Sequence, residues 1–98
     1  MTVHHACRIL FVDDEPYAAK YYNMALQKAG FDVRMVDNPD EALQDVASTR
    51  SDVVVLDLMI PPGKAYASQD HHDGLRTGVL LLNDVRKMLP NAGIIVLS

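Results

Sequence analysis

Apolar and polar positions fall into alternating blocks along the chain, and the blocks predict strands and helices in turn. Four short apolar blocks have the length and composition of strands: Arg8–Val12, Phe31–Met35, Val53–Leu56 and Ile94–Leu97. The blocks VVVL and IIVL contain no polar residue, as expected for strands that helices cover on both faces. The segments between them carry apolar residues at helical spacing.

These intervening segments predict three helices. The first begins at Pro16, a favoured residue for a first turn, and stops at Gly30. Its expected buried side is Ala18, Tyr21, Tyr22, Ala25 and Ala29. The second begins at Asn38, which can cap the first turn, with Pro39 at the first helical position. Its expected buried side is Ala42, Leu43, Val46 and Ala47. The third ends at Pro90, and its expected apolar positions are Leu75, Val79, Leu82, Val85 and Leu89.

Strands that alternate with helices indicate an α/β fold with a doubly wound, parallel sheet. A length of 98 residues fits one domain. The net charge of −4 argues against nucleic-acid binding by this segment, and no apolar run is long enough to cross a membrane. Cys7 is the only cysteine, which excludes an internal disulfide and fits a reducing, cytoplasmic location.

Acidic residues follow two of the apolar strands directly. Asp13 and Asp14 come after the first strand, and Asp57 comes after the third. If the strand order is 2-1-3-4, these strands are neighbours and their carboxyl ends lie at the same edge, where such folds bind ligands. Three carboxylates at so short a distance repel one another, so some must take up a proton or share a cation. An all-oxygen site suits Mg²⁺ or Mn²⁺. One carboxylate could then act as a nucleophile towards a phosphoryl group. The alternative is that the acids are solvated turn residues or helix caps.

The same segments carry a family resemblance. The sequence ILFVDDEP at 9–16 resembles the opening of response-regulator receiver domains, and VVVLDLMIP at 53–61 resembles their phosphorylation strand. Asp73–Gly74 is similar to the pair that precedes the family's third helix, and IIVLS at 94–98 resembles its fourth strand. The resemblance spans nearly the whole chain and implies a flavodoxin-like fold.

The resemblance also implies roles for single residues. Asp57 corresponds to the phosphoacceptor, and Asp13 and Asp14 correspond to the metal-binding acids, with Asp14 preferred as a direct ligand. The backbone carbonyl of Met59 would be a further ligand, and Ser98 would be the switch hydroxyl that bonds the phosphoryl group. The implied cofactor is Mg²⁺ (or Mn²⁺), and the implied donor is a sensor histidine kinase or a phosphotransfer protein. Such a domain accepts a phosphoryl group without turning over an external substrate, so it is not expected to be an enzyme.

Two features depart from the family pattern. The segment 62–72 is longer than the family's usual link and should lie beside the acidic site. It could gate phosphodonors, contact a partner, or be a tolerated surface insertion. The sequence also ends at Ser98, before the family's last helix, strand and helix. The receiver domain at 1–98 is therefore expected to be incomplete at its C-terminus, which leaves the fourth strand as a bare apolar edge. Such an edge predicts a homo-oligomer.

Two other functions compete with phosphoryl acceptance. A truncated receiver could have lost signalling and serve as an interaction or oligomerisation module. An aspartate-nucleophile phosphatase of the haloacid-dehalogenase type also places its nucleophile after an apolar strand. That class requires a second aspartate two residues later, and this chain has Met59 there.

Overall fold

A computed structural model describes residues 6–61, 63, 64, 66 and 75–97 of the chain. Strands and helices alternate in the predicted order. The elements are β1 (Arg8–Val12), α1 (Pro16–Lys28), β2 (Asp32–Val36), α2 (Pro39–Ser48), β3 (Val53–Asp57), α3 (Leu75–Met88) and β4 (Gly93–Leu97). The α/β class expected from the apolar pattern is confirmed.

The four strands form one parallel sheet in the order β2-β1-β3-β4, which confirms the expected order 2-1-3-4. The direction in which successive strands are added to the sheet therefore reverses between β1 and β3, and doubly wound folds bind their ligands at this point. β2 and β4 are the two outer strands.

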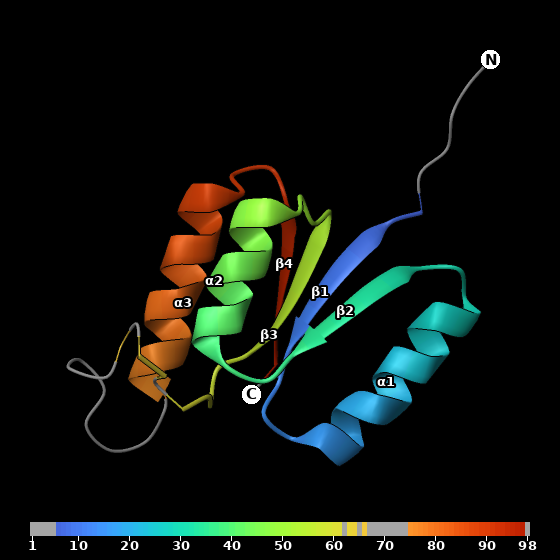
Figure 1. The fold of residues 1–98 in the computed structure, drawn as a ribbon, viewed down its shortest axis with the longest axis horizontal. Coiled ribbons are helices and arrows are strands. Elements are labelled where there is room, and N and C mark those ends of the chain that lie inside the picture. Colours follow the sequence, from blue (N-terminus) through green and yellow to red (C-terminus); the bar gives the residue numbers. More distant parts are fainter. Residues whose placement is uncertain (1–5, 62, 65, 67–74, 98) are drawn as a thin grey trace.

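Helices cover both faces of the sheet, with α2 and α3 on one side and α1 on the other (Figure 1). On the α2–α3 side, the buried cluster includes Leu10, Val54, Leu56, Leu81 and Val85. A smaller cluster on the α1 side contains Ile9, Phe11 and Val55. Alternate residues of β1 and β3 thus point into two different cores, which explains why these strands are apolar without interruption.

Local signals mark where α2 begins and where α1 ends. Pro39 occupies the first turn of α2, and the side chain of Asn38 caps it by accepting the Glu41 N–H at 2.9 Å. After α1, Gly30 adopts a φ of +98°, and its N–H donates to the carbonyl of Gln27 at 3.0 Å. Glycine reaches this left-handed conformation without the penalty of a side chain, so the chain can reverse into β2.

The buried sides of α1 and α3 differ from the sequence expectation. Tyr21 and Tyr22 are 74% and 55% exposed, whereas the neighbouring Ala19 is buried. In α3, Val79 is exposed, and the buried positions include Thr77, Leu81 and Val85. The apolar pattern counts tyrosine as a core residue and threonine as a surface residue, so it misplaces part of each helix face. Val85 and Leu89, which were expected on the apolar side of the third helix, are buried.

The outer strand β2 is tied to α2 by a charged network. Arg34 donates to both carboxylate oxygens of Asp45, at 2.7 and 2.9 Å, and to the hydroxyl of Ser51 at 2.7 Å. Ser51 is buried just before β3, so one guanidinium links β2, α2 and the start of β3. Within the described part of the chain, no helix is both long and apolar enough to span a membrane.

Candidate functional site

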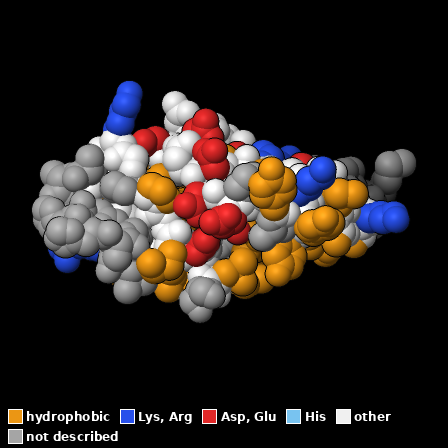
Figure 2. Space-filling view, turned by 90° about the horizontal axis from the view of Figure 1, so that it is seen from below, with side chains coloured by type: hydrophobic (Ala, Val, Ile, Leu, Met, Phe, Trp, Pro, Cys, Tyr) orange, Lys and Arg blue, Asp and Glu red, His pale blue; other side chains and the backbone are white. Residues whose placement is uncertain are grey.

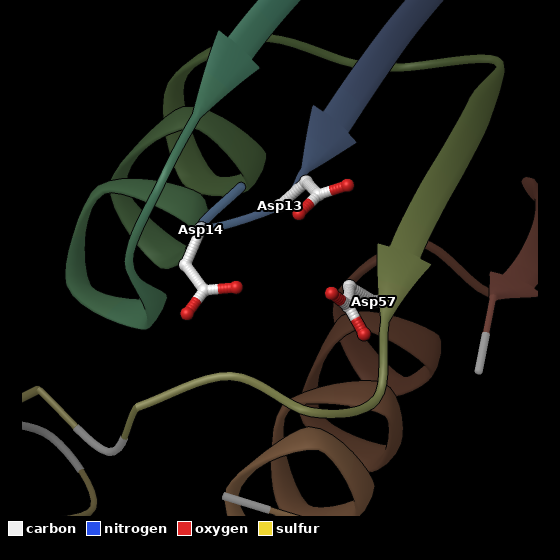
Figure 3. Close-up of side chains that lie close together, drawn as sticks. All are labelled: Asp13, Asp14 and Asp57. Atoms are coloured by element: carbon white, nitrogen blue, oxygen red, sulfur yellow. The ribbon is translucent and has the colours of Figure 1, made fainter. Parts of the chain in front are cut away.

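The register of the sheet brings the acidic residues together. Val12 lies opposite Leu56 in the pairing of β1 with β3. The next residue along β1 is Asp13, and the next along β3 is Asp57, so these residues reach the same edge side by side. Figure 3 shows Asp13 and Asp14 just past the end of β1 and Asp57 at the end of β3, with the three side chains close together. The predicted convergence of these residues is confirmed.

Each of the three acids offers one carboxylate oxygen to a common space. Those three oxygens all lie within 4.8 Å of one another. Asp13 is only 8% exposed, while Asp14 and Asp57 are partly exposed. Asp and Glu side chains gather near the middle of the surface on which the strands end (Figure 2). Oxygen atoms at this spacing, with access to water, are the ligand set that Mg²⁺ or Mn²⁺ uses.

Backbone hydrogen bonds orient two of the carboxylates. Oδ1 of Asp13 accepts the N–H of Glu15 at 2.8 Å, and Oδ1 of Asp57 accepts the N–H of Met59 at 2.9 Å. Both bonds span two residues, as in Asx turns, so each turn holds its own acid. The N–H of Leu58 donates to the carbonyl of Leu97 at 3.0 Å, which ties the turn after Asp57 to β4.

Among the three acids, Asp13 has a carboxyl pKa that the folded structure raises. Burial raises the pKa of its carboxyl above the ordinary value, and the hydrogen bond from Glu15 opposes this effect. The charges of Asp57 and Asp14, together with a hydrogen bond to Asp57, raise the pKa further. Without a cation, the folded protein therefore holds a proton on Asp13 more tightly than the unfolded chain does.

This imbalance predicts how stability depends on pH in a chelator. Between the unfolded pKa of 3.8 and the raised folded pKa, the native state binds more protons, so the Asp13 contribution falls as pH rises. We expect Asp13→Asn to increase the free energy of unfolding at neutral pH, and the gain to vanish below pH 3.8. Urea unfolding across a pH series in EDTA measures it, with exposed Glu15→Gln as the control. A difference in unfolding free energy between Asp13→Asn and wild type that is negative, or that does not change with pH, would contradict the raised pKa of Asp13.

The remaining site residues named from the sequence are only partly placed. Met59 follows the Asp57 turn, and its side chain is 47% exposed. Ser98 lies outside the described residues, as do Asp73 and Gly74. Of the segment 62–72, which was expected to be longer than the family's usual link, positions 63, 64 and 66 are described. Tyr66 is 5% exposed and belongs to the core on the α2–α3 side.

A cavity of about 510 Å³ opens beside the acids, between α1 and the end of β2. Asp13 and Asp14 form one end of it, and Asp37 and Glu41 line it further along. Asn23 also lines this cavity, and its Oδ1 is buried without a hydrogen-bond partner among the described residues. The cavity makes the two β1 acids accessible from the β2 side, whereas Asp57 does not line it.

Two residues near the site were missed by sequence reasoning. Gly78 packs against the backbone of Leu58, next to Asp57, and Tyr66 is bound to Asp84 of α3. A single glycine inside a helical pattern is a weak signal of close backbone packing, and it could have marked Gly78. Tyr66 lies in a segment rich in Pro, Gly, Ser and His, and nothing in that composition marks it as buried.

Comparisons with known proteins agree with this geometry. Residues 9–98 match the family described as the response regulator receiver domain. The DNA-binding response regulator MtrA of Mycolicibacterium smegmatis is 43% identical over 54 residues. That match covers 55% of this chain and 24% of MtrA, so the chain aligns with about a quarter of this curated relative.

Three solved structures of two proteins show the same fold. A CheY-like receiver domain from Methanospirillum hungatei superposes with a TM-score of 0.76 at 21% identity, covering 94% of this chain and 63% of its own. TrrA of Thermotoga maritima has a TM-score of 0.71 in two structures. The complex with the histidine kinase ThkA gives 32% identity, covering 93% of this chain and 67% of that one. The complex with Mg²⁺-BeF gives 31% identity, covering 91% of this chain and 66% of that one. The chain belongs to the response regulator receiver domain family.

Proposed function

We propose that this receiver domain accepts a phosphoryl group on Asp57 from a phosphohistidine donor, with Mg²⁺ (or Mn²⁺) held by Asp13, Asp14, Asp57 and the backbone carbonyl of Met59. The observation that carries the proposal is the trio of carboxylate oxygens within 4.8 Å of one another at the ends of β1 and β3. Similarity to TrrA, whose structures contain Mg²⁺-BeF and a histidine kinase, supports the cation and the class of donor.

The chemistry follows from what these residues can do. A carboxylate oxygen of Asp57 attacks phosphorus while the P–N bond to the donor imidazole breaks. The imidazole leaves with the electron pair and takes up a proton from water, and Asp57 becomes an acyl phosphate. A cation in the site would neutralise charge on the carboxylates and on the phosphoryl oxygens. The Met59 N–H holds Asp57 in place through the bond at 2.9 Å. Ser98 is proposed as the switch hydroxyl.

A small acyl-phosphate donor tests the proposal without a kinase. Wild-type protein incubated with the donor and Mg²⁺ should gain the mass of one phosphoryl group, and the gain should be labile to base and to hydroxylamine. The same incubation in EDTA should give no gain. Absence of the gain in Mg²⁺ would overturn phosphoryl acceptance, and an equal gain in EDTA would overturn the role of the cation.

Partners and location form the rest of the proposal. The donor is a sensor histidine kinase or a phosphotransfer protein, and the single cysteine fits the cytoplasm. The net charge of −4 disfavours direct contact between this segment and nucleic acid. The role is one of signalling, in which the domain modifies itself and turns over no external substrate.

A second function, self-association, is favoured by the outer strand β4. Its free edge pairs with no strand among residues the structure describes, and Ile95 and Val96 are 52% and 40% exposed. An apolar edge without a charged residue is a template for pairing with another chain.

We expect the 98-residue chain to dimerise through β4. Its sedimentation coefficient should rise with concentration, and Ile95→Lys should hold it as a monomer because the charge opposes edge pairing. Val79→Lys, at an exposed position of α3, is the matched control and should leave association intact. Asp57→Asn should also leave it intact. A monodisperse wild-type monomer across the whole concentration series would contradict this function.

A further inference from the structure

Helix α3 makes unusually close contact with the chain just after Asp57. A Cβ atom added at Gly78 would lie 2.0 Å from the carbonyl oxygen of Leu58 and 2.7 Å from its Cα. Both neighbours are backbone atoms, which cannot rotate away as a side chain can. Gly78 itself is buried in α3. Any larger residue at position 78 must therefore displace the helix or the turn that carries Leu58.

That turn is the one that shapes the acidic site. Leu58 lies between Asp57 and Met59, and the Met59 N–H donates to Asp57 Oδ1 at 2.9 Å. On its other side, the Leu58 N–H is fixed to the carbonyl of Leu97 at 3.0 Å. A shift of the Leu58 backbone would thus move the Met59 carbonyl and the hydrogen bond that orients Asp57.

The described residues of the segment 62–72 are hydrogen-bonded to α2 and α3. Oδ2 of Asp40 in α2 accepts the N–H of Lys64 at 2.8 Å, where Gly63 turns the chain with a φ of +60°. Two residues later, the hydroxyl of Tyr66 donates to Oδ2 of Asp84 in α3 at 2.5 Å. The ring of Tyr66 is buried in the core between α2 and α3, and Ile60 is fully buried in the same core.

We propose that Gly78 and Tyr66 are positioning residues for the acidic site. Helix α3 contacts Leu58 through backbone packing at Gly78, and it contacts Tyr66 through the Tyr66–Asp84 hydrogen bond. These contacts keep the Met59 carbonyl and Asp57 in the arrangement that a cation needs. Lys64 and Tyr66 then help to hold the turn after Asp57 in position against α2 and α3. The inference rests on the proposed cation-dependent function and deepens it.

The test is a titration with Mg²⁺ in the absence of any phosphodonor. Calorimetry measures the affinity, and the amide resonance of Met59 reports on the turn. Groups that support metal ligands typically contribute about 10-fold to 100-fold to affinity, and we expect a loss in that range for Gly78→Ala. Val46→Ala is the control, because it removes buried methyl groups from the same core at a position in α2. Compared at temperatures where both are folded, only Gly78→Ala should lose affinity and shift the Met59 resonance.

A second pair of variants keeps the inference testable if Gly78→Ala fails to fold. Tyr66→Phe removes one hydroxyl and preserves the packing, and should weaken Mg²⁺ binding in the same direction by a smaller factor. Tyr17→Phe, at a position 82% exposed, should leave the affinity unchanged. If Gly78→Ala folds and binds Mg²⁺ with wild-type affinity, the inference is overturned and the proposed function stands. If Gly78→Ala does not fold, wild-type affinity in Tyr66→Phe has the same meaning. An equal loss in Val46→Ala would also overturn the inference. A wild-type chain that binds no Mg²⁺ would overturn the proposed function and the inference together.

Discussion

Asparagine at position 57 is expected to abolish phosphorylation of the protein completely. The amide that replaces the carboxylate is too poor a nucleophile to attack phosphorus, and it lacks the charge that helps hold the cation. The side-chain oxygen of asparagine can still accept the Met59 N–H, so the turn after β3 should survive the change. The measurement is the intact mass after incubation with a small acyl-phosphate donor and Mg²⁺.

The matched control for this variant is Asp52→Asn, the same substitution at the opposite end of the same strand. Asp52 is exposed and precedes β3, where its carboxylate accepts the Arg8 N–H at 2.8 Å. The control should gain one phosphoryl group as the wild type does. A gain that persists in Asp57→Asn would mean that another carboxylate is the acceptor, most directly Asp13 or Asp14.

The largest effect on stability is expected for Leu56→Ala. Leu56 has no exposed surface, and it belongs to the core shared by β1, β3, α2 and α3. Truncating a fully buried leucine removes its apolar contacts and leaves a cavity, at a cost of roughly 2–5 kcal/mol. Domains of this kind are stable by only about 5–15 kcal/mol in total, so the variant should lose a large part of its free energy of unfolding.

Urea unfolding followed by circular dichroism measures this loss. Val79→Ala is a suitable control because Val79 lies in α3 and is 43% exposed, so its truncation leaves no closed cavity and should cost much less. Since Leu56 is the residue directly before Asp57, the loss should be recorded with and without Mg²⁺. Equal stability of the Leu56 and Val79 variants would contradict the description of the core.

The placement of the acids could be predicted from the sequence because it depends on the sheet alone. Apolar blocks without polar interruption identify β1 and β3, and a parallel doubly wound order makes them neighbours. Asp13 and Asp57 are then brought to one edge by the register, whatever the details of the helices. The start of α2 was predictable for a similar reason, since capping by Asn38 is a local interaction.

Features that depend on packing at a distance could not be predicted in this way. The buried side of α1 is defined by Ala19, with Tyr22 stacked on Phe11 at a ring distance of 5.8 Å while remaining 55% exposed. An apolar pattern counts tyrosine as a core residue, whether or not its ring is covered in the folded chain. The burial of Tyr66 and the contact of Gly78 with Leu58 depend on the path of the chain between β3 and α3, and no periodic pattern encodes that path.

The central claim is that Asp57 is the residue that carries the phosphoryl group. Reduction of the phosphorylated protein with borohydride converts an aspartyl phosphate into homoserine, and tandem mass spectrometry of the peptides then locates it. We predict homoserine at position 57 alone, formed only when Mg²⁺ was present during phosphorylation. Homoserine at another aspartate, with position 57 unmodified, would contradict the account.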